Sequence, residues 1–352
     1  MKKILVTGNL GYVGPSVIRF LRNQNPTAEI FGFDAGFFIG NLTYGGRPSE
    51  TLLNAQYYGD TRSFPYDILE GIDVVVHLAA VSNDPIGNKF EDVTHNINYL
   101  ASVELAKQAK NRGVKHFVFA SSCSIYGKGG NNMKTEYDTP NPLTAYAKSK
   151  IMTEEKLDLL ADNEFIVTSL RFATACGYSE RCRLDLVLND FVASAISSGR
   201  IEVLSDGMPW RPLISVNDMA RAMGWAAQRA LDNGGPHLVI NTGSNDWNYR
   251  VLELGKIITD NIPNIELKIA NTVQSDDRSY RVNFDKFNDL AKGYLPESKI
   301  EKVVMELWEG LKAINFHDQD FRKSTLCRLI KIEALTKNQA INNQLGWAGV
   351  ID

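Results

Sequence analysis

A glycine-rich turn near the N-terminus constrains the fold of this chain more than any other feature. An apolar run, Ile4-Leu-Val6, leads into Thr7-Gly8-Asn-Leu-Gly11-Tyr-Val-Gly14, and a helical pattern follows from Pro15, a residue suited to a first helical turn. The first glycine permits a tight turn, the second lets a pyrophosphate approach the backbone, and the third lets helix and strand pack closely. Because the helix N-terminus offers free N–H groups to phosphates, the segment predicts a dinucleotide-binding unit.

A carboxylate follows this turn at the distance expected for dinucleotide binding. The second strand is expected at Ile30-Phe-Gly-Phe33 and ends at Asp34, 20 residues after Gly14. An acid at this place accepts a hydrogen bond from a ribose 2′-hydroxyl and repels a 2′-phosphate, which favours NAD over NADP. The alternative interpretation of Asp34 is a turn residue before Ala35-Gly36.

Apolar runs alternate with helical patterns along much of the chain, which predicts a parallel sheet covered by helices. Further strands are expected at 73–78, 116–120, 165–170 and 237–241, and helices at 98–112, 146–160 and 251–261. The predicted fold class is therefore α/β, a Rossmann-type doubly wound parallel sheet with a smaller, discontinuous α/β domain.

The rhythm changes after about residue 178, and the segment from 181 to 211 is mixed. The predicted division gives the dinucleotide-binding domain residues 1–178 and about 212–245, the second domain about 179–211 and 246–315, and a C-terminal helical tail 316–352. Apolar residues between 321 and 335 recur at near-helical spacing, so the tail is expected to pack on the body or on a partner.

A tyrosine and a lysine four residues apart form the second strong signal. In Thr144-Ala-Tyr-Ala-Lys-Ser-Lys150, Tyr146 and Lys150 share one face of the expected helix. An ammonium near the phenol, with the positive charge of a nicotinamide, favours phenolate and lowers the pKa of Tyr146. A lowered pKa lets one group act as acid and base near neutral pH. Taken alone, the pair is more often a chance arrangement on a solvated helix, but its place after the glycine turn favours catalysis.

Three more motifs accompany these signals: Gly59-Asp60, His77-Leu-Ala-Ala80 and Ser121-Ser-Cys-Ser-Ile-Tyr-Gly127. Together with the glycine turn, Asp34 and the Tyr146–Lys150 pair, these motifs resemble those of the extended short-chain dehydrogenases/reductases, the NAD-dependent epimerase/dehydratase family. Members of that family act mostly on nucleotide sugars. The resemblance covers roughly residues 1–315. It is specific for the family and much less specific for the reaction.

The resemblance implies a set of contacts with NAD. It implies that Asp60 binds the adenine amino group and that the backbone of Leu78–Ala80 lines the cofactor. The alternative for Asp60 is a surface turn residue. The full implied cofactor set is Gly8, Leu10, Gly11, Tyr12, Val13, Gly14, Asp34, Asp60, Thr61, Leu78, Ala79, Ala80, Tyr146 and Lys150.

The resemblance also implies the catalytic groups Ser122, Tyr146 and Lys150. The Tyr146 phenolate would remove the proton of the hydroxyl at sugar carbon 4 while Ser122 hydrogen-bonds that hydroxyl, and hydride would pass to the nicotinamide. Lys150 would hold the nicotinamide ribose and stabilise the phenolate. The alternative for Ser122 is ordinary capping at the end of a strand.

The sequence departs from the sugar 4,6-dehydratases of this family directly after the catalytic hydroxyl. Those enzymes carry Asp-Glu there, whereas this chain carries Cys123-Ser124. A serine has no useful acid/base pKa, so a standard 4,6-dehydratase is disfavoured. Cys123 is ambiguous: a thiol in a positive field exchanges protons, and it is equally a small buried packing residue.

Two arginines are expected to clamp a substrate diphosphate, because guanidinium groups match phosphate oxygens bidentately. Arg211 stands in a segment resembling the family's GDG…R…D pattern, and Arg278 in one resembling its D-x-R signature. Thr174 replaces the Asn of most relatives, and Arg183 and the segment Ser82-Asn-Asp84 are weaker candidates for the same pocket. The alternative for the two main arginines is a solvated surface position.

We therefore predict an NAD-dependent nucleotide-sugar epimerase that transfers hydride at carbon 4 through a transient keto sugar. The alternatives are a dehydratase or 3,5-epimerase using Cys123 as acid/base, a 4-keto reductase, and a dinucleotide-sensing regulator without enzymatic activity. The resemblance implies a homodimer formed through the helices at about 98–112 and 146–160.

Composition adds mainly exclusions. The 352 residues carry a net charge of −3, with no basic run or motif that reads nucleic acid. No stretch approaches the roughly 18 apolar residues of a membrane span, and no signal peptide is recognisable, so a cytoplasmic protein is expected. The four cysteines form no CxxC pair and the five histidines are scattered, so no metal site is expected.

Overall fold

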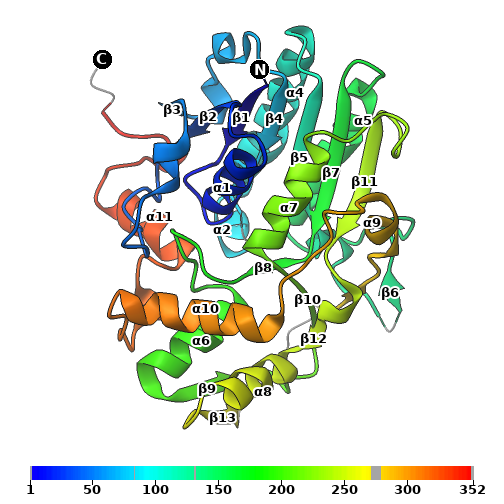
Figure 1. Cartoon of the computed structure of the whole chain (residues 1–352). Coiled ribbons are helices and arrows are strands. Elements are labelled where there is room, and N and C mark those ends of the chain that lie inside the picture. The colour runs from blue at the N-terminus through cyan, green and yellow to red at the C-terminus, as the bar shows by residue number, and fades with distance from the viewer. Residues whose placement is uncertain (1, 83, 131, 271–278, 350–352) are drawn as a thin grey trace.

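A seven-stranded parallel sheet forms the centre of the computed structural model, which describes residues 2–82, 84–130, 132–270 and 279–349 (Figure 1). The strand order is β11-β7-β5-β4-β1-β2-β3, and every neighbouring pair is parallel. The strands are β1 (Lys3–Thr7), β2 (Glu29–Asp34), β3 (Ala55–Tyr58), β4 (Val74–His77), β5 (His116–Ser122), β7 (Ile166–Phe172) and β11 (His237–Thr242). The predicted Rossmann-type fold class is thus confirmed.

Helices cover both faces of this sheet, as the alternation of side chains along a strand requires. On one face, α1 (Gly14–Gln24) and α7 (Val216–Ala226) pack on an apolar cluster that includes Ile4 and Val6. On the other, α4 (Ser102–Asn111) and α5 (Ala145–Leu160) pack on a cluster that includes Leu5. Successive residues of one strand therefore enter two separate cores.

Later segments of the chain pack into a second region below the carboxyl edge of the sheet (Figure 1). Its apolar cluster joins α6 (Val187–Ser198), α8 (Val251–Asn261) and α10 (Ile300–Ala313). Its small sheets are β8 (Thr174–Cys176) with β10 (Trp210–Ser215) and β12 (Asn248–Arg250), and β9 (Arg200–Val203) with β13 (Glu266–Ile269). Phe321 and Cys327 of the expected tail also belong to the apolar cluster of this region. A further pair, β6 (Met133–Lys134) with β14 (Arg281–Val282), packs through Val282 against the cluster that includes Ile4 and Val6.

The expected helix at 98–112 is the end of a longer helical region. This region comprises α2 (Asp84–Lys89), α3 (Glu91–His95), a π-helical segment (Asn96–Ala101) and α4. The tail carries a helix, α11 (Arg328–Lys337), which packs on the body near α2 (Figure 1). A short helix, α9 (Asp285–Leu290), contacts the edge strand β11.

Within the described residues, no helix has both the length and the apolar character that a bilayer crossing requires.

Candidate active site

A cavity of about 960 Å³ opens at the carboxyl ends of the parallel strands. It lies near the boundary between β1 and β4, where the order in which strands are added to the sheet reverses. Doubly wound sheets bind their ligands at such a switch point. The predicted site residues that line it are Gly8, Gly11, Tyr12, Val13, Gly14, Asp34, Asp60, Thr61, Leu78, Ala79, Ala80, Ser82, Ser122, Tyr146, Lys150, Thr174, Arg183 and Arg211. Leu10 and Cys123 do not line it, and Arg278 lies outside the described residues.

The glycine turn has the shape that a pyrophosphate needs. Gly8 has a φ of +71°, and a Cβ there would meet the backbone nitrogen of Ala79 at 2.5 Å. A Cβ on Gly14 would collide with the backbone of Asn9, so this glycine permits the turn itself. Helix α1 starts after Val13 with no side-chain cap. Its first N–H groups are therefore placed to receive phosphate oxygens, and these residues fit a dinucleotide.

Asp34 serves the turn and borders the cavity at once. Its carboxylate accepts hydrogen bonds from the backbone nitrogen of Leu10 at 3.0 Å and of Gly36 at 2.7 Å. Burial raises the pKa of Asp34, while these two bonds and the charges of Arg181 and Arg328 act in the opposite direction. The turn and ribose-binding interpretations are thus compatible. Leu10 itself is fully buried, so any contact it makes with a cofactor would be through its backbone.

Asp60 also combines a local role with a place on the cavity. Its side chain caps the 3₁₀ turn Thr61–Ser63 and pairs with the guanidinium of Arg62. Because both Asp60 and Thr61 line the cavity, the contact with adenine implied by the resemblance stays a prediction.

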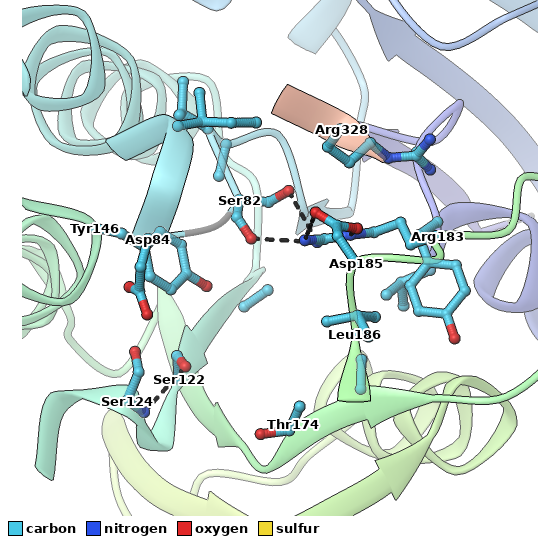
Figure 2. A pocket seen from close by; sticks show the side chains of 18 of the residues that line it. Ser82, Asp84, Ser122, Ser124, Tyr146, Thr174, Arg183, Asp185, Leu186 and Arg328 are labelled. Atoms are coloured by element: carbon cyan, nitrogen blue, oxygen red, sulfur yellow. Dashed lines mark hydrogen bonds and ion pairs between the residues drawn. The ribbon is translucent and has the colours of Figure 1, made fainter. Parts of the chain in front are cut away.

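Ser122 and Tyr146 lie on one side of the cavity (Figure 2), and Lys150 also lines it. Thr144 caps helix α5 by accepting from the Ala147 nitrogen at 3.2 Å, which starts the helix directly before Tyr146. Ser122 Oγ accepts from the Ser124 nitrogen at 3.1 Å, and the Ser122 side chain is close enough to Tyr146 to act on the pKa of its phenol. One turn later, Lys150 Nζ donates to the Ala120 carbonyl at 2.7 Å and lies 5.5 Å from the centre of the Tyr146 ring.

The sequence predicts a lowered pKa for Tyr146, but the protein's own groups raise it. Burial, and then the charge of Asp84, raise the pKa of Tyr146 to about 12, while the Ser122 hydroxyl and the charge of Arg183 act the other way. Burial also lowers the pKa of Lys150 to about 7, although Glu154 opposes this shift. The protein's own groups therefore do not supply the predicted lowering, which was to come from Lys150 and a nicotinamide charge together.

The structure does not place Cys123 where a proton-transferring group would be. Its side chain is 0% exposed within an apolar cluster, and its thiol donates to the Arg171 carbonyl at 3.0 Å. Burial raises the pKa of Cys123 above its ordinary value. These contacts are those of the packing alternative. Ser124, in contrast, lines the cavity beside Ser122 (Figure 2).

The expected substrate residues occupy the other walls. Arg183 is buried, pairs with Asp185 at 3.0 Å, and lies within 3.3 Å of the Ser82 carbonyl (Figure 2). Thr174 lies on β8, and Arg211, on β10, donates to the Trp210 carbonyl at 2.9 Å. The structure thus brings these four residues to one cavity, although it shows no ligand contact for any of them.

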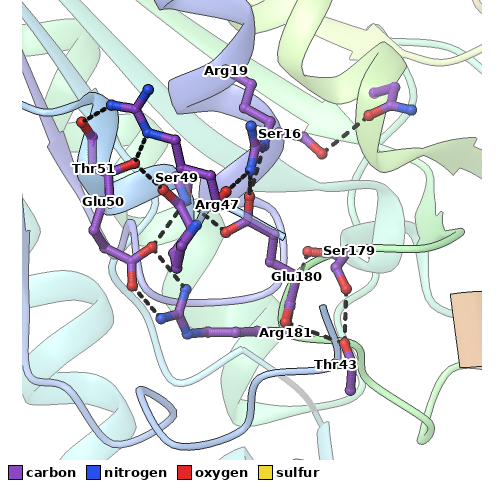
Figure 3. A network of polar contacts seen from close by, with 12 residues as sticks. Ser16, Arg19, Thr43, Arg47, Ser49, Glu50, Thr51, Ser179, Glu180 and Arg181 are labelled. Carbon is purple, nitrogen blue, oxygen red and sulfur yellow. Dashed lines mark hydrogen bonds and ion pairs between the residues drawn. The ribbon is translucent and has the colours of Figure 1, made fainter. Parts of the chain in front are cut away.

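A polar network fixes the loop that carries Arg183 (Figure 3). Glu180 accepts from Arg19 of helix α1 at 2.7 Å and from the backbone nitrogen of Ser49 at 2.8 Å. Arg181, fully buried, forms an ion pair with Glu50. The loop after β2, helix α1 and the loop 179–183 are therefore held together beside the cavity.

Sequence reasoning missed the contribution of the C-terminal tail. Arg322, Arg328, Ile332 and Leu345 all line the cavity, as do Phe37 and Phe38 after β2. The near-helical spacing in the tail indicated a helix, but nothing local indicated where that helix would pack. Asp84 was noted only as a weak substrate candidate, yet it lies beside Tyr146 (Figure 2).

A profile of the NAD dependent epimerase/dehydratase family matches residues 4–243, more than half of the chain. The chain belongs to this family. It is accordingly an NAD-dependent enzyme of the epimerase/dehydratase type, and the glycine turn and Asp34 described above are suited to that cofactor.

Its sequence relatives divide between two reactions. An uncharacterized UDP-glucose epimerase from Bacillus subtilis is 27% identical over 73% of this chain and 81% of its own length. A UDP-glucose 4-epimerase from Corynebacterium glutamicum is 24% identical over 89% of this chain and 96% of its own. A bovine dTDP-D-glucose 4,6-dehydratase is 24% identical over 90% of both chains.

Solved structures share the fold. A UDP-N-acetylglucosamine 4-epimerase from Methanobrevibacter ruminantium superimposes with a TM-score of 0.76 at 21% identity, covering 89% of this chain and 98% of the other. A structure of MoeE5 with UDP-glucose and NAD gives a TM-score of 0.73 at 23% identity, covering 88% and 99%. At such identities the likeness concerns the fold.

Proposed function

We propose that this protein is an NAD-dependent nucleotide-sugar epimerase that acts at sugar carbon 4. The observation that carries the proposal is the placement of Ser122 and Tyr146 on one wall of the cavity (Figure 2), with Lys150 one helical turn after Tyr146. The names of several relatives support the same reaction. Their substrates make UDP-hexoses the first compounds to test.

In the proposed reaction the hydroxyl at carbon 4 binds next to Ser122 and Tyr146. When bound, the cofactor would supply reversible hydride acceptance at its nicotinamide ring, so that the hydride removed from carbon 4 can return to the opposite face of the transient keto sugar. Tyr146 takes the hydroxyl proton and later returns it, while Ser122 hydrogen-bonds the same oxygen. Lys150 stands next to the phenol and, when protonated, favours its ionised form. Nothing beyond this set is required, since epimerisation consumes neither water nor acid.

A dehydratase is the second candidate, because two curated relatives of nearly full coverage are dTDP-D-glucose 4,6-dehydratases. Elimination of water needs an extra acid/base pair near carbons 5 and 6. The positions after Ser122 hold a buried thiol and a hydroxyl instead of carboxylates. The geometry therefore favours epimerisation over dehydration, and the burial of Cys123 weakens the alternatives that use its thiol.

Product analysis tests the proposal directly. The purified protein is incubated with UDP-, GDP-, CDP- and dTDP-hexoses, and the products are examined by mass spectrometry and proton NMR. An unchanged mass with an inverted carbon-4 signal is expected for one of them. A product lighter by one water would establish dehydration, and a stoichiometric change in cofactor absorbance would establish a net reductase or dehydrogenase.

A further inference from the structure

The first residue of helix α11, Arg328, places a buried cation against the cavity. Its side chain is 1% exposed and belongs to the lining, although it lies beyond the segment matched by the family profile. Nη2 donates to the Arg181 carbonyl at 2.9 Å, and the guanidinium lies 4.2 Å from the ring centre of Phe38. Nη1 is buried and has no hydrogen-bond partner among the described residues.

Other buried arginines of the described chain have their charge or their donors satisfied. Arg181 pairs with Glu50, Arg171 with Glu154, and Arg229 has no carboxylate but donates to four backbone carbonyls and to the Thr168 hydroxyl. Arg328 forms no ion pair with any described carboxylate. A buried guanidinium left in this state costs free energy, which an anion would recover.

The neighbours of Arg328 indicate which anion. The charges that act most on Arg328 are those of Arg183 and Asp185. Arg328 also acts on Asp34, at the end of β2, and on the phenol of Tyr12, in the glycine turn. Asp34 is placed for a ribose, and the glycine turn is placed for phosphates. In Figure 2, Arg328 and Arg183 lie across the cavity from Tyr146 and Ser122. Arg328 thus lies away from Tyr146 and Ser122, and its contact with Phe38 places it beside the loop that follows Asp34.

We propose that Arg328 is a cationic contact for the pyrophosphate of the bound dinucleotide, and that the C-terminal tail thereby helps to retain the cofactor. Burial, with the nearby charge of Arg183, lowers the pKa of Arg328 to about 9, and a phosphate anion would offset both effects. A nucleotide sugar carries the same diphosphate chemistry. The contact with Phe38, in the loop that follows Asp34, favours the dinucleotide as its source.

The tail is docked by contacts that do not involve this guanidinium. Lys89 of α2 pairs with Glu333 at 2.5 Å, and Trp347 donates to the Ala35 carbonyl at 2.6 Å. Ile332 and Leu345 pack in an apolar cluster with residues of α2 and α3. A substitution of Arg328 alone should therefore leave the tail in place.

Ligand binding to full-length Arg328→Met and Arg328→Lys tests the proposal without any turnover measurement, so its failure is separable from failure of the proposed reaction. Calorimetric titrations use adenosine, ADP, NAD and UDP. Losing a charge-assisted contact should weaken ADP and NAD about tenfold or more in Arg328→Met. Adenosine and UDP should bind as to the parent, and Arg328→Lys should retain part of the affinity. Arg322→Met, at another lining arginine that is already paired with Asp190, is the matched control.

Three results would overturn the proposal: unchanged binding of ADP, equal weakening of adenosine and ADP, or selective weakening of UDP. The second would make Arg328 a structural residue, and the third would assign its anion to the nucleotide sugar. If Arg328→Met does not fold, hydrogen exchange on the parent protein decides instead. Saturating ADP should protect the amides of 328–337 more than saturating adenosine does, and equal protection contradicts the inference.

Discussion

Tyr146 shares its side of the cavity with a carboxylate that opposes the charge state needed for proton abstraction. Asp84 begins α2, accepts from Thr144 Oγ1 at 2.7 Å, and lies next to the phenol (Figure 2). Its charge is the second cause, after burial, of the raised pKa of Tyr146. The same residue therefore helps to shape the N-terminal end of α5 and makes the phenolate harder to form.

Replacing Asp84 by Asn should lower the pKa of Tyr146, because a negative neighbour is removed while the amide keeps the shape of the side chain. The limb of the pH–rate profile that rises with phenolate formation should move to lower pH. Near-UV difference titration, with Tyr146→Phe as the reference, measures the same shift without substrate. Asp92→Asn, an exposed acid on neighbouring α3, should leave the limb where it is.

Lys150 should make stability depend on pH in a defined direction. The pKa of Lys150 is about 7 in the folded protein, against an ordinary value of 10.5 that applies to the unfolded chain. Between these two pH values the unfolded chain therefore binds more protons than the folded protein. Stability should therefore rise from pH 7 toward 10 by an increment that Lys150→Met lacks. Urea midpoints of both proteins across this range measure it. Parallel curves for parent and variant would show that the ammonium is not penalised by burial.

Among single residues, those that one short sequence segment identifies could be predicted from the sequence. The glycine turn, Asp34 and the Tyr146–Lys150 pair each follow from one short segment, and all of them line the cavity. Burial is not a local property, so Cys123 could not be assigned from its position beside Ser122. Arg328 reaches the cavity from a distant part of the chain, and no local pattern announces that.

Helix α5 carries Tyr146 and Lys150, and a buried polar network fixes it against the sheet. Glu154 of α5 pairs with Arg171 of β7 at 2.7 Å and accepts from Ser121 of β5 at 2.5 Å. Arg171 also donates to the hydroxyl of Tyr126 at 3.1 Å. Both charged groups are buried, so the orientation of the face of α5 that carries Tyr146 and Lys150 depends on this ion pair.

Breaking this pair from one side should be costly. Arg171→Met leaves the Glu154 carboxylate buried without its cation, and such a change typically costs about 3–5 kcal/mol. Adding Glu154→Leu should restore part of the loss, because the uncompensated charge disappears. Denaturant unfolding of the single and double variants measures both effects. Arg200→Met breaks the exposed pair with Glu266 and should cost less than about 1 kcal/mol. A similar cost for both arginines would contradict this account.

Elements were predictable where one periodicity dominated. Helix α8 begins and ends at the predicted residues, 251 and 261, and six of the seven strands of the large sheet were predicted because both faces are buried. The edge strand β3 was not predicted, since its residues are half-buried or exposed. Helix α6 was not recognised, since it is apolar on most sides within the second core. Strands β9 and β13 have four residues each and pair across a long stretch of chain, so neither gives a local signal.

The whole molecule leaves apolar side chains exposed on the helices that the family resemblance assigns to a dimer interface. Leu100, next to α4, is 49% exposed, and Leu159 of α5 is 75% exposed. Both lie in the helical layer on one face of the sheet. Two copies could cover these residues by packing their α4 and α5 layers together, which would hold the helix that carries Tyr146 from its outer side.

The expected assembly is a homodimer through this layer. Light scattering after size exclusion should give twice the mass of one chain, and the double change Leu100→Glu with Leu159→Glu should give a monomer, because four buried carboxylates would face one another without partners. Tyr137→Ser removes a larger and more exposed apolar side chain, 87% exposed, from the β6 region away from these helices, and should leave the mass unchanged. A parent protein that stays monomeric at every accessible concentration would exclude the dimer, and dissociation by Tyr137→Ser alone would move the interface to the region of β6.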